Sequence, residues 1–197
     1  MNSAFPPILV VFALGVEAQE VFERAAVPTL FTGVGKVNAA YTLTRRLSEY
    51  RAAGLPPPLV ANFGTAGSQR WPRGTLVACT RFLQRDMDVT GLGFPLGVTP
   101  FEHAPAQLEF PTSFPQLQNG TCGSGDSFET RGLAHECDVV DMEAYALAKV
   151  CWFEQARFAC AKYVTDGADH SAADDWQSNL HQAAEDFLHL YRTLLDE

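Results

Sequence analysis

The sequence predicts an α/β fold built around a largely parallel sheet. Short apolar runs alternate along the chain with amphipathic stretches of helical period, as they do in strand–helix–strand units. Glycine-rich and polar residues follow several of the apolar runs directly, where parallel sheets bind their ligands. The 197 residues, 47% of them hydrophobic, are enough to fill the core of one domain, which we expect to span residues 1–197.

The first third of the chain alternates strand and helix. Ile8–Leu14 is a continuous apolar run rich in β-branched residues, which predicts a buried strand. A helical stretch over Glu17–Ala26 follows, and then a second strand at Pro28–Val34. Lys36–Ala53 has apolar side chains at helical spacing, and Gly54 and three prolines follow it, so we expect a helix there.

The rest of the chain repeats this alternation around one irregular region. Residues 91–120 contain five spaced prolines and predict loops or edge structure. The other expected elements are strands at Leu59–Gly64, Leu76–Leu83 and Phe158–Val164, a helix over Met142–Phe153 and a long packed helix over Leu180–Leu195. Together these elements complete a sheet with helices between its strands.

Composition excludes several function classes. The net charge of −9 and the absence of a cluster of lysines and arginines argue against a nucleic-acid partner and against a membrane surface. The longest apolar run is too short to span a bilayer and lacks the features of a signal peptide. The five cysteines are odd in number and widely spaced, which favours a reduced, cytoplasmic protein with no metal site.

Four polar loops follow predicted strands or the irregular region, and they supply the candidate binding groups. Each loop alone is a common turn, and the glycines at 33 and 35 lack the spacing of a dinucleotide site. Four such loops at four strand ends instead favour one shared ligand site. The loops are Thr32–Lys36, Asn62–Ser68, Gly123–Phe128 and Thr165–Asp169.

These loops also carry a family resemblance. Four stretches of the chain resemble the methylthioadenosine/S-adenosylhomocysteine nucleosidases. They are Thr32–Ala40 (TGVGKVNAA), Ser124–Phe128 (SGDSF), Asp141–Ala144 (DMEA) and Thr165–Asp169. These enzymes belong to the purine nucleoside phosphorylase superfamily. The resemblance implies a three-layer α/β/α fold that hydrolyses a purine N-glycosidic bond without metal or cofactor. It also implies a homodimer in which the neighbouring subunit completes the 5′ pocket.

The resemblance assigns roles to particular residues. It implies that Asp166 is the purine-binding general acid, that Glu143 binds the ribose hydroxyls and that Glu20 activates water, with Glu17 as the alternative. It places Met142 against the sugar, Phe128 on the base and Glu129 beside the base. The other expected substrate contacts are Thr65 and Lys162 near the water, Ser124 in the SGDSF motif, and residues 91–102 beside the 5′ group.

The chemistry of the bond is consistent with three carboxylates. The leaving purine needs a proton, which an aspartic acid in a pocket that excludes water can supply. A carboxylate near the sugar hydroxyls stabilises the ribosyl cation, and a further carboxylate activates water on the opposite face.

The sequence leaves two alternatives to a hydrolase. A phosphorylase would need arginines around its phosphate, and residues 12–20 contain none. A non-catalytic nucleoside-binding module would keep the pocket and release no base.

Overall fold

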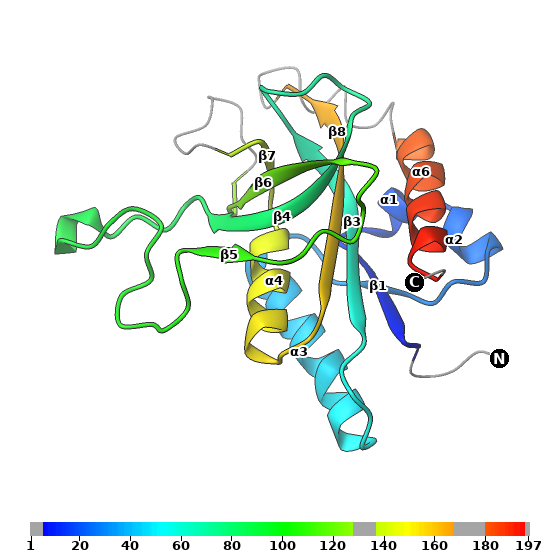
Figure 1. Ribbon diagram of the computed structural model, residues 1–197, viewed down its shortest axis with the longest axis horizontal. Coiled ribbons are helices and arrows are strands. Elements are labelled where there is room, and N and C mark those ends of the chain that lie inside the picture. The colour runs from blue at the N-terminus through cyan, green and yellow to red at the C-terminus, as the bar shows by residue number, and fades with distance from the viewer. Residues whose placement is uncertain (1–5, 128–136, 168–179, 196–197) are drawn as a thin grey trace.

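The computed structural model describes residues 6–127, 137–167 and 180–195, which form one mixed sheet of eight strands with helices on both faces (Figure 1). The strands are β1 (Ile8–Phe12), β2 (Thr29–Phe31), β3 (Leu59–Gly67), β4 (Leu76–Gln84), β5 (Gln107–Glu109), β6 (Gln118–Ser124), β7 (Val139–Asp141) and β8 (Phe158–Asp166). The helices are α1 (Gly15–Ala18), α2 (Val21–Arg24), α3 (Lys36–Ala52), α4 (Ala144–Phe153) and α6 (Leu180–Thr193), with a 3₁₀ turn η1 (Thr90–Leu92). None of the helices in these ranges is long and apolar enough to cross a membrane.

The strand order brings distant parts of the sequence together. The sheet runs β2-β1-β3-β7-β6-β4-β5, and β8 pairs with both β3 and β4. Strand β8 is parallel to β3 and antiparallel to β4, and all nine of its residues are buried. Strands β1, β3 and β8 run in the same direction and end at the same edge of the sheet, where Gly67 at the end of β3 also pairs with Val140 of the antiparallel strand β7. Residues far apart in sequence meet at this edge.

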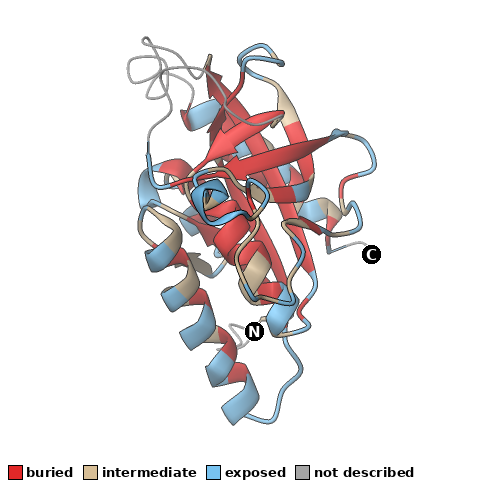
Figure 2. Ribbon diagram, turned by 90° about the vertical axis from the view of Figure 1, so that its left-hand side faces the viewer, coloured by how far each residue is buried: buried red, intermediate tan, exposed pale blue. Residues whose placement is uncertain are grey.

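Two apolar cores lie on opposite faces of the sheet. Helices α3 and α4 bury Leu43, Leu47 and Leu147 against one face, where Phe82 and Phe158 stack edge to face with ring centroids 5.2 Å apart. Helices α1, α2 and α6 cover the other face (Figure 1), around Phe187 and its aromatic neighbours. Figure 2 shows the strands buried between the helical layers while the outer helix surfaces are exposed. The expected α/β architecture with helices on both faces is confirmed.

Two features differ from the sequence expectation. The helix expected over residues 17–26 is two short helices, α1 and α2, separated by Gln19, whose φ of 49° breaks the helical path. Strands β6 and β7 were not predicted, because one is rich in small residues and the other has three residues only. Residues 91–120, by contrast, contain loops and the short edge strand β5, as expected.

The segment between β4 and β5 projects from the body of the molecule (Figure 1). We call residues 91–102 the β4–β5 arm. Phe94 and Phe101 pack edge to face with ring centroids 5.4 Å apart, yet Phe101 is 95% exposed and Leu92 is 74% exposed. At the base of the arm, Glu102 forms an ion pair of 2.7 Å with Lys149 of α4. The arm is thus anchored at one end and presents apolar side chains to solvent.

Candidate functional site

A cavity of about 260 Å³ lies beyond the ends of β3, β7 and β8. The loops after β1, β2, β4 and β6 contribute the rest of its wall. Apolar side chains, including those of Leu14, Val34, Val140 and Met142, line part of it. Its polar lining consists of Glu17, Thr65, Arg85, Ser127, Asp141, Glu143, Thr165 and Asp166. Four of these eight side chains are carboxyl groups, and they come from three separate parts of the sheet edge: α1, the end of β7 and the end of β8.

Glu143 is the residue that precedes α4, and its side chain reaches across the cavity wall to another loop. The backbone amide of Gly35 donates a hydrogen bond of 2.8 Å to Glu143 Oε1, and the side chain does not cap its own helix. Glu143 is only 7% exposed. Burial, followed by the charge of Asp141, raises the pKa of Glu143 from 4.5 to about 7. This carboxyl group therefore changes its charge close to neutral pH.

Asp166 is the last residue of β8 and is 4% exposed. The hydroxyl of Thr165 donates a hydrogen bond of 2.9 Å to Asp166 Oδ2. The backbone carbonyl of Asp166 accepts a hydrogen bond of 3.0 Å from the amide of Ser68, which ties the strand end to the end of β3. Asp166 and Glu143 therefore line one cavity, as expected from the sequence.

The carboxylate that the first loop contributes is Glu17. Glu17 lies in α1, is 5% exposed and lines the cavity. Its Oε1 accepts hydrogen bonds of 3.0 Å from both the amide and the hydroxyl of Thr65, and its Oε2 accepts one of 3.1 Å from the amide of Leu14. Two backbone amides and one hydroxyl thus fix the Glu17 carboxyl group against the end of β3.

Glu20 does not share this cavity, which corrects the expectation that it lies beside Asp166 and Glu143. Its side chain is 81% exposed and lies 3.9 Å from Arg24, one helical turn away. The physical reason is the break at Gln19, which directs the residues after it away from the sheet edge. Of the two alternatives in the first loop, the structure brings Glu17 to the site.

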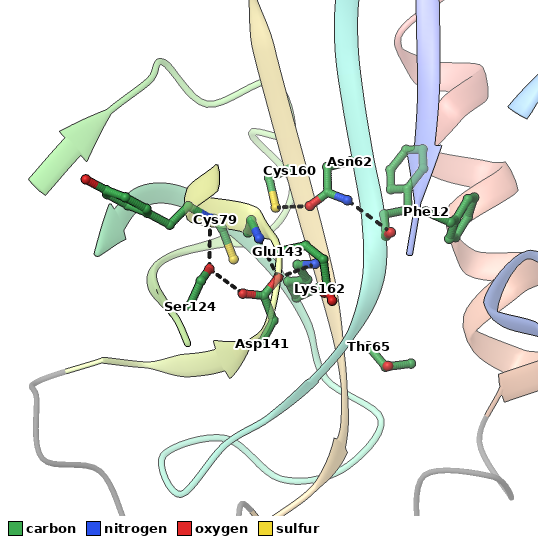
Figure 3. A network of polar contacts seen from close by, with 12 residues as sticks. Phe12, Asn62, Thr65, Cys79, Ser124, Asp141, Glu143, Cys160 and Lys162 are labelled. Atoms are coloured by element: carbon green, nitrogen blue, oxygen red, sulfur yellow. Dashed lines mark hydrogen bonds and ion pairs between the residues drawn. The ribbon is translucent and has the colours of Figure 1, made fainter. Parts of the chain in front are cut away.

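Lys162 and Ser124 are absent from the cavity lining and contact Asp141 instead (Figure 3). Lys162 is 2% exposed, and its Nζ is 2.8 Å from Asp141 Oδ2. Ser124 is fully buried, donates a hydrogen bond to Asp141 and accepts one of 2.8 Å from the amide of Tyr145. Both residues therefore contact Asp141 and neither lines the cavity, which corrects the expectation that they are substrate contacts.

The Asp141–Lys162 pair is ionised in its buried position. Burial opposes the charge of Lys162, but the adjacent carboxylate outweighs this effect and raises the pKa of Lys162 well above its usual value. Burial likewise opposes the charge of Asp141, while Lys162, Ser124 and the amide of Ala144 lower its pKa. The carboxylate of Asp141 also raises the pKa of the neighbouring Glu143, so the pair sets the electrostatic environment of the cavity.

The remaining expected residues have different outcomes. Met142 is half-buried and lines the cavity, as does Thr65. Phe128 and Glu129 lie outside the described residues. The β4–β5 arm, expected beside the 5′ group, does not line this cavity within its own chain. In the parts of the chain that the structure describes, no three His, Cys, Asp or Glu side chains form a group that could hold a metal ion.

Arg85 is a cavity residue that the sequence reasoning did not single out. It follows β4 directly, and its guanidinium donates to the Ser127 hydroxyl at 3.2 Å and to the Gly125 carbonyl at 3.4 Å. A Cβ on Gly125 would lie 2.9 Å from Arg85 Cζ, so a side chain at this position would require the guanidinium to move. The position of Arg85 immediately after a strand, where site residues gather, is the signal that could have found it.

The chain is similar in sequence to known enzymes over most of its length. The phosphorylase superfamily profile matches residues 26–196. A 5′-methylthioadenosine/S-adenosylhomocysteine nucleosidase of Marinomonas sp. (strain MWYL1) is 32% identical over 186 residues, which cover 83% of this chain and 78% of that protein. The nucleosidase of the same name from Bacillus subtilis (strain 168) is 29% identical over 188 residues, with the same coverage of the two chains.

Solved structures show the same fold. A Helicobacter pylori 5′-methylthioadenosine/S-adenosylhomocysteine nucleosidase, complexed with a pyrrolidine compound, has a TM-score of 0.81 at 20% identity and covers 96% of this chain and 97% of that one. A futalosine hydrolase mutant from the same organism has a TM-score of 0.81 at 20% identity and covers 96% and 98%. From the profile match and the sequence identity, this chain belongs to the phosphorylase superfamily and, within it, to the 5′-methylthioadenosine/S-adenosylhomocysteine nucleosidases.

Proposed function

We propose that the protein hydrolyses the N-glycosidic bond of a 5′-substituted adenine nucleoside, such as 5′-methylthioadenosine or S-adenosylhomocysteine, and releases adenine. The observation that carries this proposal is that Glu17, Glu143 and Asp166 line one cavity. Three carboxyl groups from three loops correspond to the three tasks of the reaction.

Asp166 is the general acid of the proposed mechanism. Cleavage of the bond between C1′ and N9 leaves a poorly stabilised nitrogen anion unless N7 of the purine takes up a proton. The Asp166 carboxyl group is buried at the cavity and accepts one hydrogen bond from Thr165, which holds it in place. A general acid in this position accelerates the reaction by roughly 10²–10⁴-fold.

Glu143 binds the ribose in its ionised form. As the base departs, positive charge develops on the ribosyl ring, and a carboxylate beside the 2′ and 3′ oxygens stabilises this charge. Neighbouring Met142 supplies an apolar surface to the cavity next to Glu143. Because the pKa of Glu143 is about 7, the fraction of enzyme in the competent ionised form rises across neutral pH.

Glu17 activates the attacking water. Its Oε1 already accepts from the amide and the hydroxyl of Thr65, so the carboxylate has a fixed orientation before substrate binds. A carboxylate that removes a proton from water opposite the departing base gives the single-displacement route of an inverting hydrolase.

The charges of the cavity favour water over phosphate as the nucleophile. The lining contains four carboxyl groups, those of Glu17, Asp141, Glu143 and Asp166, and one guanidinium, that of Arg85. Lys162 does not line the cavity and is paired with Asp141. A phosphate dianion would meet more negative than positive side chains in this lining, which is the reverse of a phosphate site.

The active form is a homodimer in this proposal. The β4–β5 arm carries Leu92 and Phe101 into solvent and does not line the cavity of its own chain. Exposed apolar groups of this kind are typical of protein interfaces. A second copy of the chain would cover the arm, and the arm of that copy would supply the wall beside the 5′ substituent.

The proposal is tested with a panel of purine nucleosides incubated with the purified protein. The panel holds 5′-methylthioadenosine, S-adenosylhomocysteine, futalosine, adenosine and inosine, each with and without phosphate. We expect base release and a free ribose derivative without phosphate, and a loss of at least about 10²-fold in kcat for Asp166→Asn.

Two results would contradict this function. Release that requires phosphate and yields a ribose 1-phosphate would identify a phosphorylase. Binding of adenine or a nucleoside by calorimetry, with no release from any compound in the panel, would identify a binding module.

A further inference from the structure

Three loops beside the cavity meet at a cluster of charged side chains. Lys36 is the first residue of α3, Asp86 follows β4 and Asp126 follows β6. Lys36 forms an ion pair with Asp86, its Nζ lies 3.5 Å from Asp126 Oδ2, and the amide of Asp126 donates a hydrogen bond of 2.9 Å to Asp86 Oδ2. These residues stand in the segments TGVGKVNAA, RDMDVTG and SGDSF, and the mechanism above uses none of the three.

The cluster is partly withdrawn from water. The Lys36 side chain is 14% exposed and that of Asp86 33%. Burial works against the charge of Asp86, but hydrogen bonds from Lys36 and from the Asp126 amide outweigh it and lower the pKa of Asp86. Asp86 therefore keeps its charge through the pH range in which Glu143 titrates.

This cluster is joined to Glu143 through two consecutive backbone amides. The amide of Lys36 donates to Asp126 Oδ1 at 2.8 Å, and the amide of Gly35 donates to Glu143 Oε1 at 2.8 Å. Gly35 has a φ of +95°, a conformation that side-chain-bearing residues rarely adopt, and a Cβ there would lie 3.2 Å from Asp126 Oδ1. The carbonyl of Gly35 accepts a hydrogen bond of 3.0 Å from the amide of Ala39 in α3, so the start of the helix and the Asp126 carboxylate together hold the loop that presents the Gly35 amide.

We propose that Lys36, Asp86 and Asp126, which we call the loop clasp, are positioning residues that hold the Gly35 amide on Glu143 and so fix the ionised ribose carboxylate. The proposal rests on the proposed function for the role of Glu143, but the contact itself can be measured without substrate.

The loop clasp has a consequence for the ionisation of Glu143 that can be separated from simple charge effects. The charged groups that act on Glu143 are Asp141 from β7, Glu17 from α1 and Lys162 from β8, and the Gly35 amide adds one hydrogen bond to its anion. Arg85 and Asp166 line the same cavity. Loss of the amide would raise the pKa of Glu143. Loss of the negative charge of Asp126, with the hydrogen bond kept, would lower the pKa of Glu143.

The test is Asp126→Ala in the whole chain, with the carboxyl group of Glu143 titrated by NMR on protein labelled with ¹³C-glutamate. Glu143→Gln identifies the signal, because the signal is missing from its spectrum. We expect Asp126→Ala to raise the pKa of Glu143 by about one unit, the order expected for one lost hydrogen bond to a charged group. The acid limb of kcat/KM should move upward by the same amount.

Matched variants separate position from charge. Asp126→Asn keeps an oxygen that accepts from the Lys36 amide and removes the negative charge, so its Glu143 pKa should fall slightly and should not rise. Glu49→Ala removes one exposed carboxylate about 20 Å further along α3, by the helical rise over 13 residues, and should leave the pKa unchanged. Asp86→Ala removes the acceptor of the Asp126 amide and should also raise the pKa, which provides a second variant if Asp126→Ala does not fold.

The outcomes distinguish the loop clasp from the proposed function. A Glu143 pKa that falls or stays unchanged in folded Asp126→Ala and Asp86→Ala overturns the loop clasp, whatever the activity of the wild type. If the wild type releases no base, and the Glu143 pKa still rises in Asp126→Ala and Asp86→Ala, the proposed function is overturned and the loop clasp is supported. The same upward shift in Glu49→Ala would make the effect nonspecific and would overturn the clasp.

Discussion

Two glutamates three residues apart have opposite environments. Glu17 is buried and accepts three hydrogen bonds, whereas the Glu20 side chain is 81% exposed. Glu17→Gln should lower kcat by at least about 10²-fold, because the amide cannot take a proton from water. Glu20→Gln should leave kcat close to the wild-type value. Initial rates of adenine release measure both, with circular dichroism to confirm folding, and a larger loss in Glu20→Gln than in Glu17→Gln would reverse this assignment.

The ionised form of Glu143 is expected to lower the free energy of unfolding of the protein. Its pKa is about 7 in the folded state against 4.5 as its ordinary value, so the folded state holds the proton more tightly. Stability from this group is therefore present at low pH and is lost as pH rises from 4.5 through 7. Glu143→Gln should be inactive, yet more stable than the wild type at pH 8 by at most about 3 kcal/mol, with a much smaller gain at about pH 5.

Urea unfolding of the wild type and Glu143→Gln at the two pH values checks this prediction. The quantity to compare is the free energy of unfolding of each protein, extrapolated to water. An equal stability difference under the acidic and the alkaline condition would show that Glu143 does not titrate in this window. Glu49→Gln, at an exposed position, serves as the control and should show no such pH dependence.

At the same scale, the sequence could suggest Glu17 and Glu20 but could not choose between them. In one continuous helix over residues 17–26, residues three apart share a face, so both side chains would be equivalent candidates. The positive φ at Gln19 divides that helix and separates the two faces. Gln19 has no side-chain feature that predicts this conformation. The family resemblance pointed to Glu143 and Asp166 through their motifs, and the sequence also predicts the strand that ends beside Asp166, but not the strand β7 that precedes Glu143.

Among the elements, β8 contributes Lys162, one of the two residues of the buried ion pair beside the cavity. Lys162 is fixed in the middle of this strand and pairs with Asp141 at the end of β7. Removal of one partner of a buried ion pair leaves an uncompensated charge, which costs roughly 3–5 kcal/mol. Lys162→Met should therefore destabilise the protein by that order. The double variant Lys162→Met with Asp141→Asn should recover part of the loss, because no buried charge remains unpaired.

Chemical denaturation of the two single variants and the double variant tests this double-mutant cycle. Additive losses would show that the two side chains do not interact energetically. Exposed Arg24 and Glu20, whose atoms lie 3.9 Å apart, offer the matched control pair, and their cycle should give a coupling close to zero.

Strand β6 could not be predicted, because its residues lack the side-chain pattern of a strand. Strand β6 has the sequence QNGTCGS, which lacks the β-branched and apolar residues that signal a strand. Its Gly120 lies under Val77 and Trp71, and a Cβ would come within 2.7 Å and 2.8 Å of their side chains. A side chain at Gly120 would therefore displace Val77 and Trp71. Long apolar or amphipathic elements, such as α3 and α6, were predicted within a few residues because they fill their own cores.

At the scale of the whole molecule, the β4–β5 arm is a segment whose apolar side chains Leu92 and Phe101 stay exposed in a single chain. Phe101 is 95% exposed, so Phe101→Ala should leave the unfolding free energy of a monomer unchanged. If the arm completes the neighbouring site, the same variant should weaken dimerisation and raise KM for substrates with large 5′ groups. Leu195→Ala, which removes a side chain that is 57% exposed just after α6, should change neither.

Sedimentation at several concentrations, combined with kinetics, tests the arm. A wild-type chain that stays monomeric at micromolar concentration and keeps full activity would exclude the homodimer. The family resemblance supplied this expectation, and charge and periodicity could not have done so, because an exposed apolar loop has the same composition as a buried one.

The place of β8 in the sheet also bears on how the chain is made. This strand joins β3 to β4, but it is translated well after both of them. Until it emerges from the ribosome, the parts of β3 and β4 that pair with β8 remain exposed to other nascent chains. Assembly of the sheet must therefore await synthesis of β8, and products that terminate before it would be prone to aggregate.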